Sequence, residues 1–264
     1  MIKRSVGKWF SHYKHNENAK INLFCFVFAG GSPTFFSSWK NVFSDEINVL
    51  PVIYPFREKR MGEPMPKTVD ELVRTFINEN KKMLSAKPWG VWGHCSGALI
   101  GFETAYALKD SGNPASFFIV SGCEAPASAL DRLMLSFDFS QMTDGDILND
   151  LLLFDLVDAD LVKDEDFNRY FFPIYRVDLE MFRHYIYDSN KKMEIPALVM
   201  NGTEDKMVSA ERSRKWREYI GSRIEFAEFS GKHYFINDHV EEISRAISAF
   251  ILKNACSLDR KSVV

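Results

Sequence analysis

The segment at residues 93–97 (GHCSG) constrains the fold of this chain more than any other. An apolar run at 89–92 precedes it, and a helix-forming stretch at 97–108 follows it. A nucleophile between two glycines, set between a strand and a helix, is a nucleophile elbow. The glycines are needed because the turn is strained and backbones pass close on both sides. The pattern predicts that the turn lifts Cys95 out of a sheet, beside the N–H groups of the following helix.

Strands and helices alternate on both sides of this elbow. Apolar runs predict strands at 21–28, 48–54, 89–92, 115–120, 196–200 and 223–229, and helical spacing predicts helices at 68–84, 97–108, 210–219 and 240–252. Such alternation predicts right-handed crossovers and a parallel sheet. Residues from about 123 to 192 show helical patterns without a convincing strand, which predicts an inserted helical lid. We therefore expect one domain over 1–264 with an α/β-hydrolase fold, in which helices cover both faces of a mostly parallel sheet.

A cysteine nucleophile needs a base, and the base needs an orienting carboxylate. In this fold class they follow the nucleophile in the order acid, then histidine. Asp205 comes just after the strand predicted at 196–200 and is the predicted acid, with Glu204 as the neighbouring alternative. His233 lies in the loop after the strand predicted at 223–229 and is the predicted base. The five other histidines lack this position and order: His12, His15, His94, His184 and His239.

Two backbone N–H groups are expected to stabilise the negative oxygen that forms during acyl transfer. One belongs to Ser96, directly after the nucleophile. The other is expected from Ala29, in the loop after the first strand, where Gly30 and Gly31 allow close approach of the backbone. Taken together, the pattern predicts a hydrolase-like site with an oxyanion hole.

Composition argues against several other classes of protein. The net charge of −3 gives no reason to expect nucleic acid binding. The four cysteines form no C-x-x-C pair, so neither a metal site nor a disulfide framework is indicated. Cys25 and Cys123 are interpreted as small buried hydrophobic residues and Cys256 as a thiol of the chain's tail. No signal peptide or membrane-spanning run is recognised. We expect a monomeric cytoplasmic protein that needs no metal and no cofactor.

The chain resembles the stand-alone type II thioesterases of nonribosomal peptide and polyketide pathways, which are α/β hydrolases. The resemblance covers nearly the whole chain through seven segments in one order: LFCFVFAGGS, YPFREKRMGEP, GHCSG, FFIVSGCEAP, FFPIYRVDLEMFRHYIYD, PALVMNGTEDKMVS and FSGKHYFI. It implies cleavage of acyl groups from the phosphopantetheine arm of an acyl or peptidyl carrier protein, which clears stalled or misprimed arms. The matching motifs assign triad roles to Cys95, Asp205 and His233, and oxyanion roles to Ala29 and Ser96.

The sequence departs from the pattern of that family in three places. Val27 and Phe28 replace Pro-His, and Phe56 replaces glycine; both changes are expected to alter the mouth of the pocket. The third is Cys95, where the family usually has serine; an engineered replacement of serine is the other explanation of this residue. An acyl group on Cys95 is a thioester, which reacts with amines more readily, relative to water, than an oxyester does. An acyltransferase or cyclase is therefore the alternative function, and a small-ester hydrolase and a non-catalytic binding protein also stay open.

The distribution of charged residues along the sequence indicates where a carrier protein would dock. Residues 138–166 carry ten acids and one base, Lys163. An acidic carrier protein would be repelled by such a segment, so docking is expected elsewhere, near Arg57, Lys59 and Arg60. The basic residues of a later helix are interpreted as solvated: Arg212, Arg214, Lys215 and Arg217. Five aromatic residues of the lid suggest an apolar acyl pocket: Phe137, Phe139, Phe154, Phe171 and Phe172.

Overall fold

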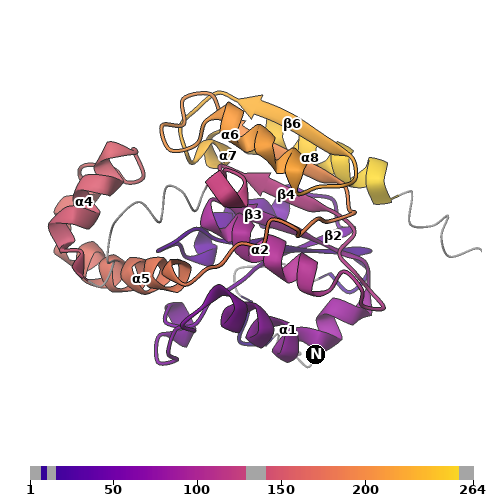
Figure 1. Cartoon of the computed structure of the whole chain (residues 1–264), viewed down its shortest axis with the longest axis horizontal. Helices are drawn as coiled ribbons and strands as arrows, with labels where there is room; N and C mark the ends of the chain where they lie inside the picture. The colour runs from indigo at the N-terminus through magenta and orange to yellow at the C-terminus, as the bar shows by residue number, and fades with distance from the viewer. Residues whose placement is uncertain (1–6, 11–15, 129–140, 256–264) are drawn as a thin grey trace, which may run out of the picture.

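A single parallel sheet forms the centre of the computed structural model, which describes residues 7–10, 16–128 and 141–255 (Figure 1). Its six strands lie in the order β2-β1-β3-β4-β5-β6, and every neighbouring pair is parallel. The strands are β1 (Ile21–Phe26), β2 (Ile47–Pro51), β3 (Trp89–His94), β4 (Phe118–Ser121), β5 (Ala197–Gly202) and β6 (Ile224–Phe229). The predicted parallel sheet is confirmed, with each expected strand present and its ends shifted by a few residues.

The order of the strands determines where the predicted site residues lie. The chain runs from β1 outward to β2 and then returns to the other side of β1 for β3. The loops after β1 and β3 therefore leave the sheet side by side at its carboxyl edge. In open α/β sheets, ligands bind in the crevice that forms where the strand order reverses in this way. The topology brings the loop that contains Ala29 next to the elbow that contains Cys95.

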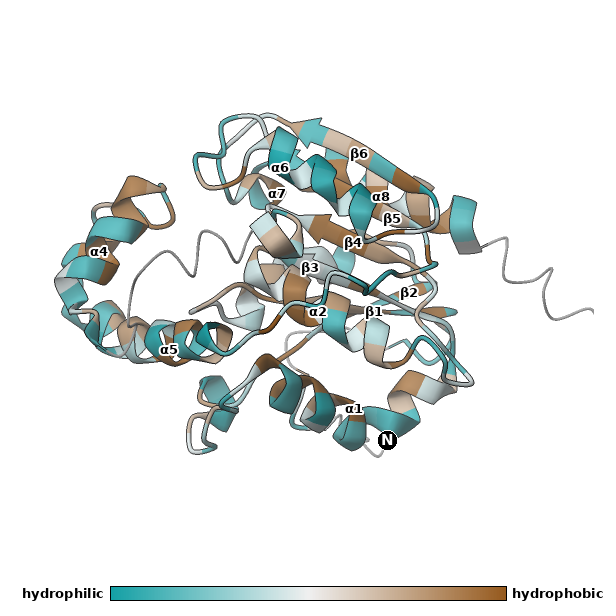
Figure 2. Ribbon diagram, in the orientation of Figure 1, coloured by the Kyte–Doolittle hydropathy of each residue, from teal (hydrophilic) through white to brown (hydrophobic). Residues whose placement is uncertain are grey.

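Helices cover both faces of the sheet, as the sequence predicts. The helices and turns outside the lid are η1 (Pro33–Asn41), η2 (Glu58–Arg60), α1 (Val69–Ala86), α2 (Ser96–Ala107), α6 (Ala210–Arg214), η5 (Lys215–Glu218), α7 (Phe235–Asp238) and α8 (Val240–Ala255). On one face, Phe76 of α1 packs on Phe24, and Phe102 of α2 packs on Phe118. On the other face, η1 packs on β3, and α8 reaches the start of β4. Strand β4 is largely hydrophobic and α6 largely hydrophilic (Figure 2), so burial drives this layering.

The chain between β4 and β5 contains the helices of the lid: α4 (Asp144–Leu153), η4 (Leu161–Lys163) and α5 (Glu165–Arg183). A capping box at Thr143 begins α4, and the Asp164 side chain caps α5. Figure 1 shows α4 and α5 standing beside the sheet rather than on one of its faces. The lid has a hydrophobic core of its own, centred on Ile147, Leu151 and Phe172. The limits of the insertion, about 123–192, and the single-domain assignment of 1–264 stay predictions.

Two of the predicted elements differ in detail. The helix expected at 210–219 is α-helical only through Arg214 and continues as the 3-10 turn η5, as often happens at helix ends. This tighter winding accompanies complete burial of Trp216, whose Nε1–H donates to the carbonyl of Cys123 at 3.1 Å. His94 is the last residue of β3 and not part of the turn. Six residues discussed above lie outside the described ranges: His12, His15, Phe137, Asp138, Phe139 and Cys256.

Candidate active site

The elbow has the strained backbone that its sequence predicts. Cys95 lies between β3 and α2 with φ 52° and ψ −130°, which is a rare conformation for a residue with a side chain. Its N–H donates to the carbonyl of Ser121 at 2.9 Å, which fixes the turn to β4. A Cβ atom on Gly93 would lie 2.2 Å from Cα of Ala98, and one on Gly97 would lie 2.2 Å from the carbonyl oxygen of Phe26. Only glycine fits at these two positions, so the turn holds the thiol at the N-terminus of α2.

The predicted acid and base meet below this thiol. His233 follows β6, Asp205 follows β5, and His233 Nδ1 lies 2.8 Å from Asp205 Oδ2. Both side chains are almost fully buried, with exposed fractions of 1% and 0%. The other oxygen of Asp205 accepts the N–H groups of Met207 and Val208, which fixes the carboxylate. Glu204 is exposed, so the structure places Asp205 and not its neighbour against the imidazole.

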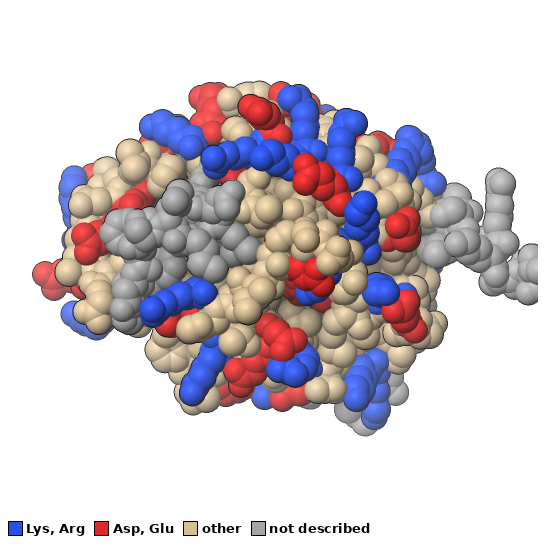
Figure 3. Space-filling model, in the orientation of Figure 1, with Lys and Arg blue, Asp and Glu red and all other residues tan. Residues whose placement is uncertain are grey.

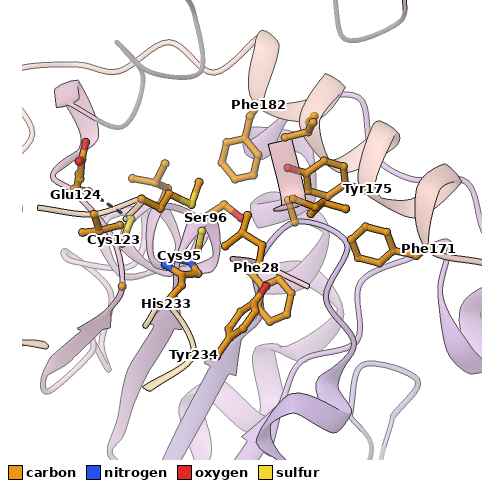
Figure 4. A pocket seen from close by; sticks show the side chains of 18 residues that line it. Phe28, Cys95, Ser96, Cys123, Glu124, Phe171, Tyr175, Phe182, His233 and Tyr234 are labelled. Atoms are coloured by element: carbon orange, nitrogen blue, oxygen red, sulfur yellow. Dashed lines mark hydrogen bonds between the residues drawn. The ribbon is translucent and has the colours of Figure 1, made fainter. Parts of the chain in front are cut away.

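The other side of the imidazole faces Cys95 (Figure 4). Burial by itself would lower the pKa of His233, because a charged ring is costly away from water. The negative charge of a Cys95 thiolate and the hydrogen bond to Asp205 oppose this effect and raise the pKa of His233 to about 10. Cysteine, histidine and aspartate are thus brought together in the order that nucleophilic catalysis requires.

A titration of His233 tests this coupling. We expect the pKa of His233 to fall when Cys95→Ala removes the thiolate, because the positive ring then loses a negative neighbour while the burial that disfavours its charge stays. At neutral pH the ring of the wild-type protein is then protonated to a greater extent than that of the variant. NMR of the ring carbons against pH measures both values. The same pKa in both proteins would show that Cys95 and His233 do not interact.

His94 lies behind the proposed base. It is fully buried, its Nδ1 lies 3.0 Å from Ser121 Oγ, and its ring centroid is 5.1 Å from that of His233. Burial, and then the charge of His233, hold the pKa of His94 well below its usual range. A neutral His94 therefore packs against His233 without competing for its proton.

Both predicted oxyanion residues line the pocket above Cys95. Ala29 comes from the loop after β1, and Ser96 is the first residue of α2. The structure thus places four of the five predicted site residues in the lining of one cavity: Ala29, Cys95, Ser96 and His233. The fifth, Asp205, is linked to the cavity through its contact with His233. The N-terminus of a helix favours negative charge, so the start of α2 suits an oxyanion.

The pocket is predominantly apolar and is closed on one side by the lid. Figure 4 shows Phe171, Tyr175 and Phe182 of α5 across the cavity from Cys95. Leucines and a valine complete the wall: Leu99, Leu151, Leu156, Leu179 and Val208. Of the aromatic residues expected to line it, Phe171 does so, whereas Phe172 belongs to the lid core and Phe154 caps the end of α4. Sequence inspection missed Tyr175, Leu179 and Phe182, although their spacing along α5 marks one helical face.

Of the positions that depart from the family pattern, Phe28 lines the pocket as expected, whereas Phe56 is not among the described residues that line it. Phe28 packs on Phe35 and Tyr234, with ring centroids 4.9 and 5.0 Å apart. Phe56 has φ 61°, a left-handed conformation that glycine adopts without penalty. A side chain there costs about 1 kcal/mol. The glycine that the family usually has at this position is therefore the less strained choice.

The expected docking role is wrong for Arg57 and Arg60, whereas Lys59 is exposed. Arg57 and Arg60 are buried, so their charges are not on the surface. Arg60 stacks on the Trp9 ring at 3.9 Å and pairs with Glu63, and Lys59 donates to the carbonyl of Phe10. Burial of the two arginines was not foreseen because Asp178, which pairs with Arg57, and Trp9, on which Arg60 stacks, are distant from them in sequence.

The basic residues of the late helix occur among acids on the surface, as Figure 3 shows for one face of the molecule. Arg214 pairs with Glu228 at the surface, at 3.0 Å. Arg212 instead pairs at 3.3 Å with Glu124, a buried residue that lines the pocket, so the interpretation of Arg212 as solvated is incomplete. Cys123 is buried, as its interpretation as a small hydrophobic residue predicts, and it also lines the pocket. Within the described ranges, no group of three or more acids, histidines or cysteines is arranged to hold a metal ion. The described helices include none with the length and hydropathy of a membrane span.

Comparison with known proteins identifies the family. The protein-family model of the thioesterase domain matches residues 21–251 of this chain. Thioesterase PikA5 of Streptomyces venezuelae is 26% identical over 258 residues, which cover 97% of this chain and 90% of the relative. Gramicidin S biosynthesis protein GrsT of Aneurinibacillus migulanus is 28% identical over 240 residues, which cover 90% of this chain and 91% of the relative. The solved structure of the type II thioesterase BorB from the borrelidin biosynthetic cluster has a TM-score of 0.81 at 25% identity, and the match covers 92% of this chain and 97% of BorB. The chain therefore belongs to the thioesterase family and is a thioester hydrolase with an α/β-hydrolase fold.

Proposed function

We propose that this enzyme hydrolyses acyl or aminoacyl thioesters on the phosphopantetheine arm of carrier proteins, with Cys95, His233 and Asp205 as its catalytic triad. One observation carries the proposal: His233 lies between Cys95 and Asp205 at the floor of a pocket whose walls are apolar. The names of the relatives supply the context, since PikA5 and BorB are thioesterases and GrsT belongs to gramicidin S biosynthesis. Carrier proteins of such assembly lines are the proposed partners, and release or editing of their acyl groups is the proposed role.

The first half of the reaction transfers the acyl group to the enzyme. The Cys95 thiolate attacks the carbonyl carbon of the substrate thioester, and the negative oxygen that forms is bound by the N–H groups of Ala29 and Ser96. The bond to the arm sulfur then breaks, and His233 gives its proton to that sulfur. One thioester replaces another, so this step is nearly isoenergetic and reversible.

The second half returns the enzyme to its starting state. Acylation removes the negative charge of Cys95, and with it one of the causes that raise the pKa of His233. The ring is then a better base, and it takes a proton from water as the water oxygen attacks the acyl carbon. The bond to Cys95 breaks, the acid leaves, and the proton on His233 again faces a thiolate. Asp205 orients the imidazole throughout.

The apolar walls suggest the kind of acyl group that is bound. Leu151 and Leu156 of the lid segment line the pocket together with Leu99 and Val208, which lie outside the lid. An acyl chain with an apolar end would remove these surfaces from water, and the carrier protein would stay outside the lid. The proposed substrates are therefore carrier-bound thioesters with apolar acyl chains.

Product analysis with an acyl-loaded carrier protein tests the function. The enzyme is expected to release free acid and leave a free thiol on the arm, both with and without an added amine. Titration measures the thiol that is freed on the arm, and chromatography identifies the acyl product. An amide formed in place of the acid would favour the acyltransferase, and a carrier that stays loaded would contradict both hypotheses.

A serine variant separates hydrolysis from transfer. We expect Cys95→Ser to retain hydrolysis and to make no amide, because an oxyester on the enzyme is less reactive toward amines than a thioester. The assay is the same product analysis, with the amine present in both reactions. If the wild-type enzyme makes an amide that the serine variant does not, the acyltransferase is the correct assignment.

A further inference from the structure

The oxyanion loop at residues 29–31 is held by a side chain of the lid. The N–H of Gly30 donates to Oδ2 of Asp178 at 2.7 Å, and Asp178 belongs to the lid helix α5. Gly30 has φ 75°, so this peptide is turned in a way that only glycine adopts easily. Residues 30 and 178 are 148 positions apart, and their contact joins the lid to the peptide that directly follows Ala29.

Arg57 completes the connection from a third segment, the loop after β2. Its Nη1 donates to the carbonyl of Gly31 at 2.7 Å, and its Nη2 donates to Oδ1 of Asp178 at 2.5 Å. The two charged side chains are 0% and 2% exposed. The ion pair therefore binds the N–H of Gly30 and the carbonyl of Gly31 in the same loop, and burial shields these contacts from solvent.

The charge on Asp178 depends on these partners. Burial raises the pKa of its carboxyl group, and the Arg57 guanidinium and the Gly30 N–H oppose that effect. Both oxygens are used, one for the loop and one for the arginine. A buried carboxylate is tolerated only when it is paired and hydrogen-bonded in this way, so the network is expected to act as a unit.

The same turn of α5 also carries walls of the acyl pocket. Tyr175, Leu179 and Phe182 line the cavity, and Tyr175 and Phe182 lie on the same helical face as Asp178, three residues before it and four after it. The position of α5 therefore sets the pocket wall and, through Asp178, the loop that contains Ala29. Displacement of the lid would therefore remove this wall of the pocket and the support of the oxyanion loop at the same time.

We propose that Asp178, held by Arg57, is a positioning residue that fixes the Ala29 N–H for oxyanion binding, so that full catalysis requires α5 to be docked. This inference rests on the proposed function, because it concerns the same reaction. It adds that the lid completes the catalytic machinery as well as the pocket. Neither residue touches the reacting atoms.

The proposed role of Asp178 has different consequences for two reactions of the Cys95 thiol. Attack on a thioester carbonyl generates an oxyanion, whereas alkylation by iodoacetamide occurs at a saturated carbon and generates none. Misplacing the oxyanion donor is therefore expected to slow thioester hydrolysis and to leave alkylation of Cys95 unchanged. A general disturbance of the site would slow both.

The test uses the double variant Arg57→Met with Asp178→Leu, which replaces the buried ion pair by apolar side chains and avoids an unpaired buried charge. We expect kcat for an acyl thioester to fall by about 10- to 100-fold with little change in KM. Alkylation of Cys95 is expected to stay within about twofold of the wild-type rate, since it needs no oxyanion donor. If circular dichroism shows that the double variant does not fold, Asp178→Asn is measured in the same way.

Arg176→Met is the matched control. Arg176 lies on α5 two residues before Asp178, and within the described part of the chain it donates to the carbonyl of Met142 and pairs with Asp144 of α4 at 2.7 Å. It is expected to keep kcat near the wild-type value. The inference is overturned if kcat and alkylation fall together in the double variant, if neither falls, or if the control loses kcat equally. A wild-type enzyme that hydrolyses no acyl thioester would instead refute the proposed function.

Discussion

Replacing Cys95 by alanine is expected to reduce thioester hydrolysis by about 10⁴-fold or more, because the variant has no atom that can accept the acyl group. The elbow itself should survive, since alanine fits wherever cysteine does and the two flanking glycines are unchanged. The measurement is release of free thiol from an acyl-loaded carrier protein, at enzyme concentrations high enough to detect the residual rate. Thermal unfolding of the variant checks that the fold is intact.

Cys25→Ala provides the control for this experiment. Cys25 is a fully buried thiol within β1 and does not line the pocket, so its loss removes a thiol without touching the site. This variant is expected to hydrolyse the thioester at nearly the wild-type rate. Hydrolysis that persists in Cys95→Ala would mean that a different group attacks the substrate.

The second large effect is expected at Asp205. We expect Asp205→Asn to lower hydrolysis by roughly 10³- to 10⁴-fold, because an amide cannot hold the imidazole in the required tautomer or stabilise its charge. The carboxylate accepts the His233 ring N–H at 2.8 Å and two backbone N–H groups. An asparagine retains the backbone contacts through its oxygen, so the loss should fall on catalysis rather than on folding.

Glu204→Gln is the matched comparison for that acid. Glu204 is adjacent in sequence and exposed, and its substitution is expected to leave hydrolysis within about twofold of the wild type, as is usual for surface changes. Steady-state rates for the two variants decide between the two acids considered from the sequence. A greater loss in Glu204→Gln than in Asp205→Asn would reverse the assignment.

The elbow, the acid and the base could be located from the sequence because each follows a strand directly. A buried parallel strand has a recognisable apolar pattern, and the first residues after it lie at the carboxyl edge of the sheet. Once the strands were recognised, the topology alone brought the loops of Cys95, Asp205 and His233 together. The loop of Ala29 is located by the same reasoning, since β1 and β3 are neighbours.

The lid contacts could not be predicted in this way. Asp178 lies in a helix whose pattern shows which face is apolar but not which part of the chain that face meets. Arg57 looks like a surface charge until its partner is known, and that partner lies 121 residues away. The structure shows such long-range pairs directly. The pair with Asp178 explains why Arg57, which was expected to be a surface charge near a docking site, is buried.

Time-resolved intact-mass spectrometry of the enzyme mixed with an acyl-loaded carrier protein tests the central claim most directly. The proposed mechanism predicts a transient enzyme species heavier by the acyl group, mapped to Cys95 by peptide analysis, while the carrier loses that mass. Free acid should accumulate as the adduct disappears. A carrier that is unloaded without acylation of Cys95, or an adduct that forms on another residue, would contradict the account.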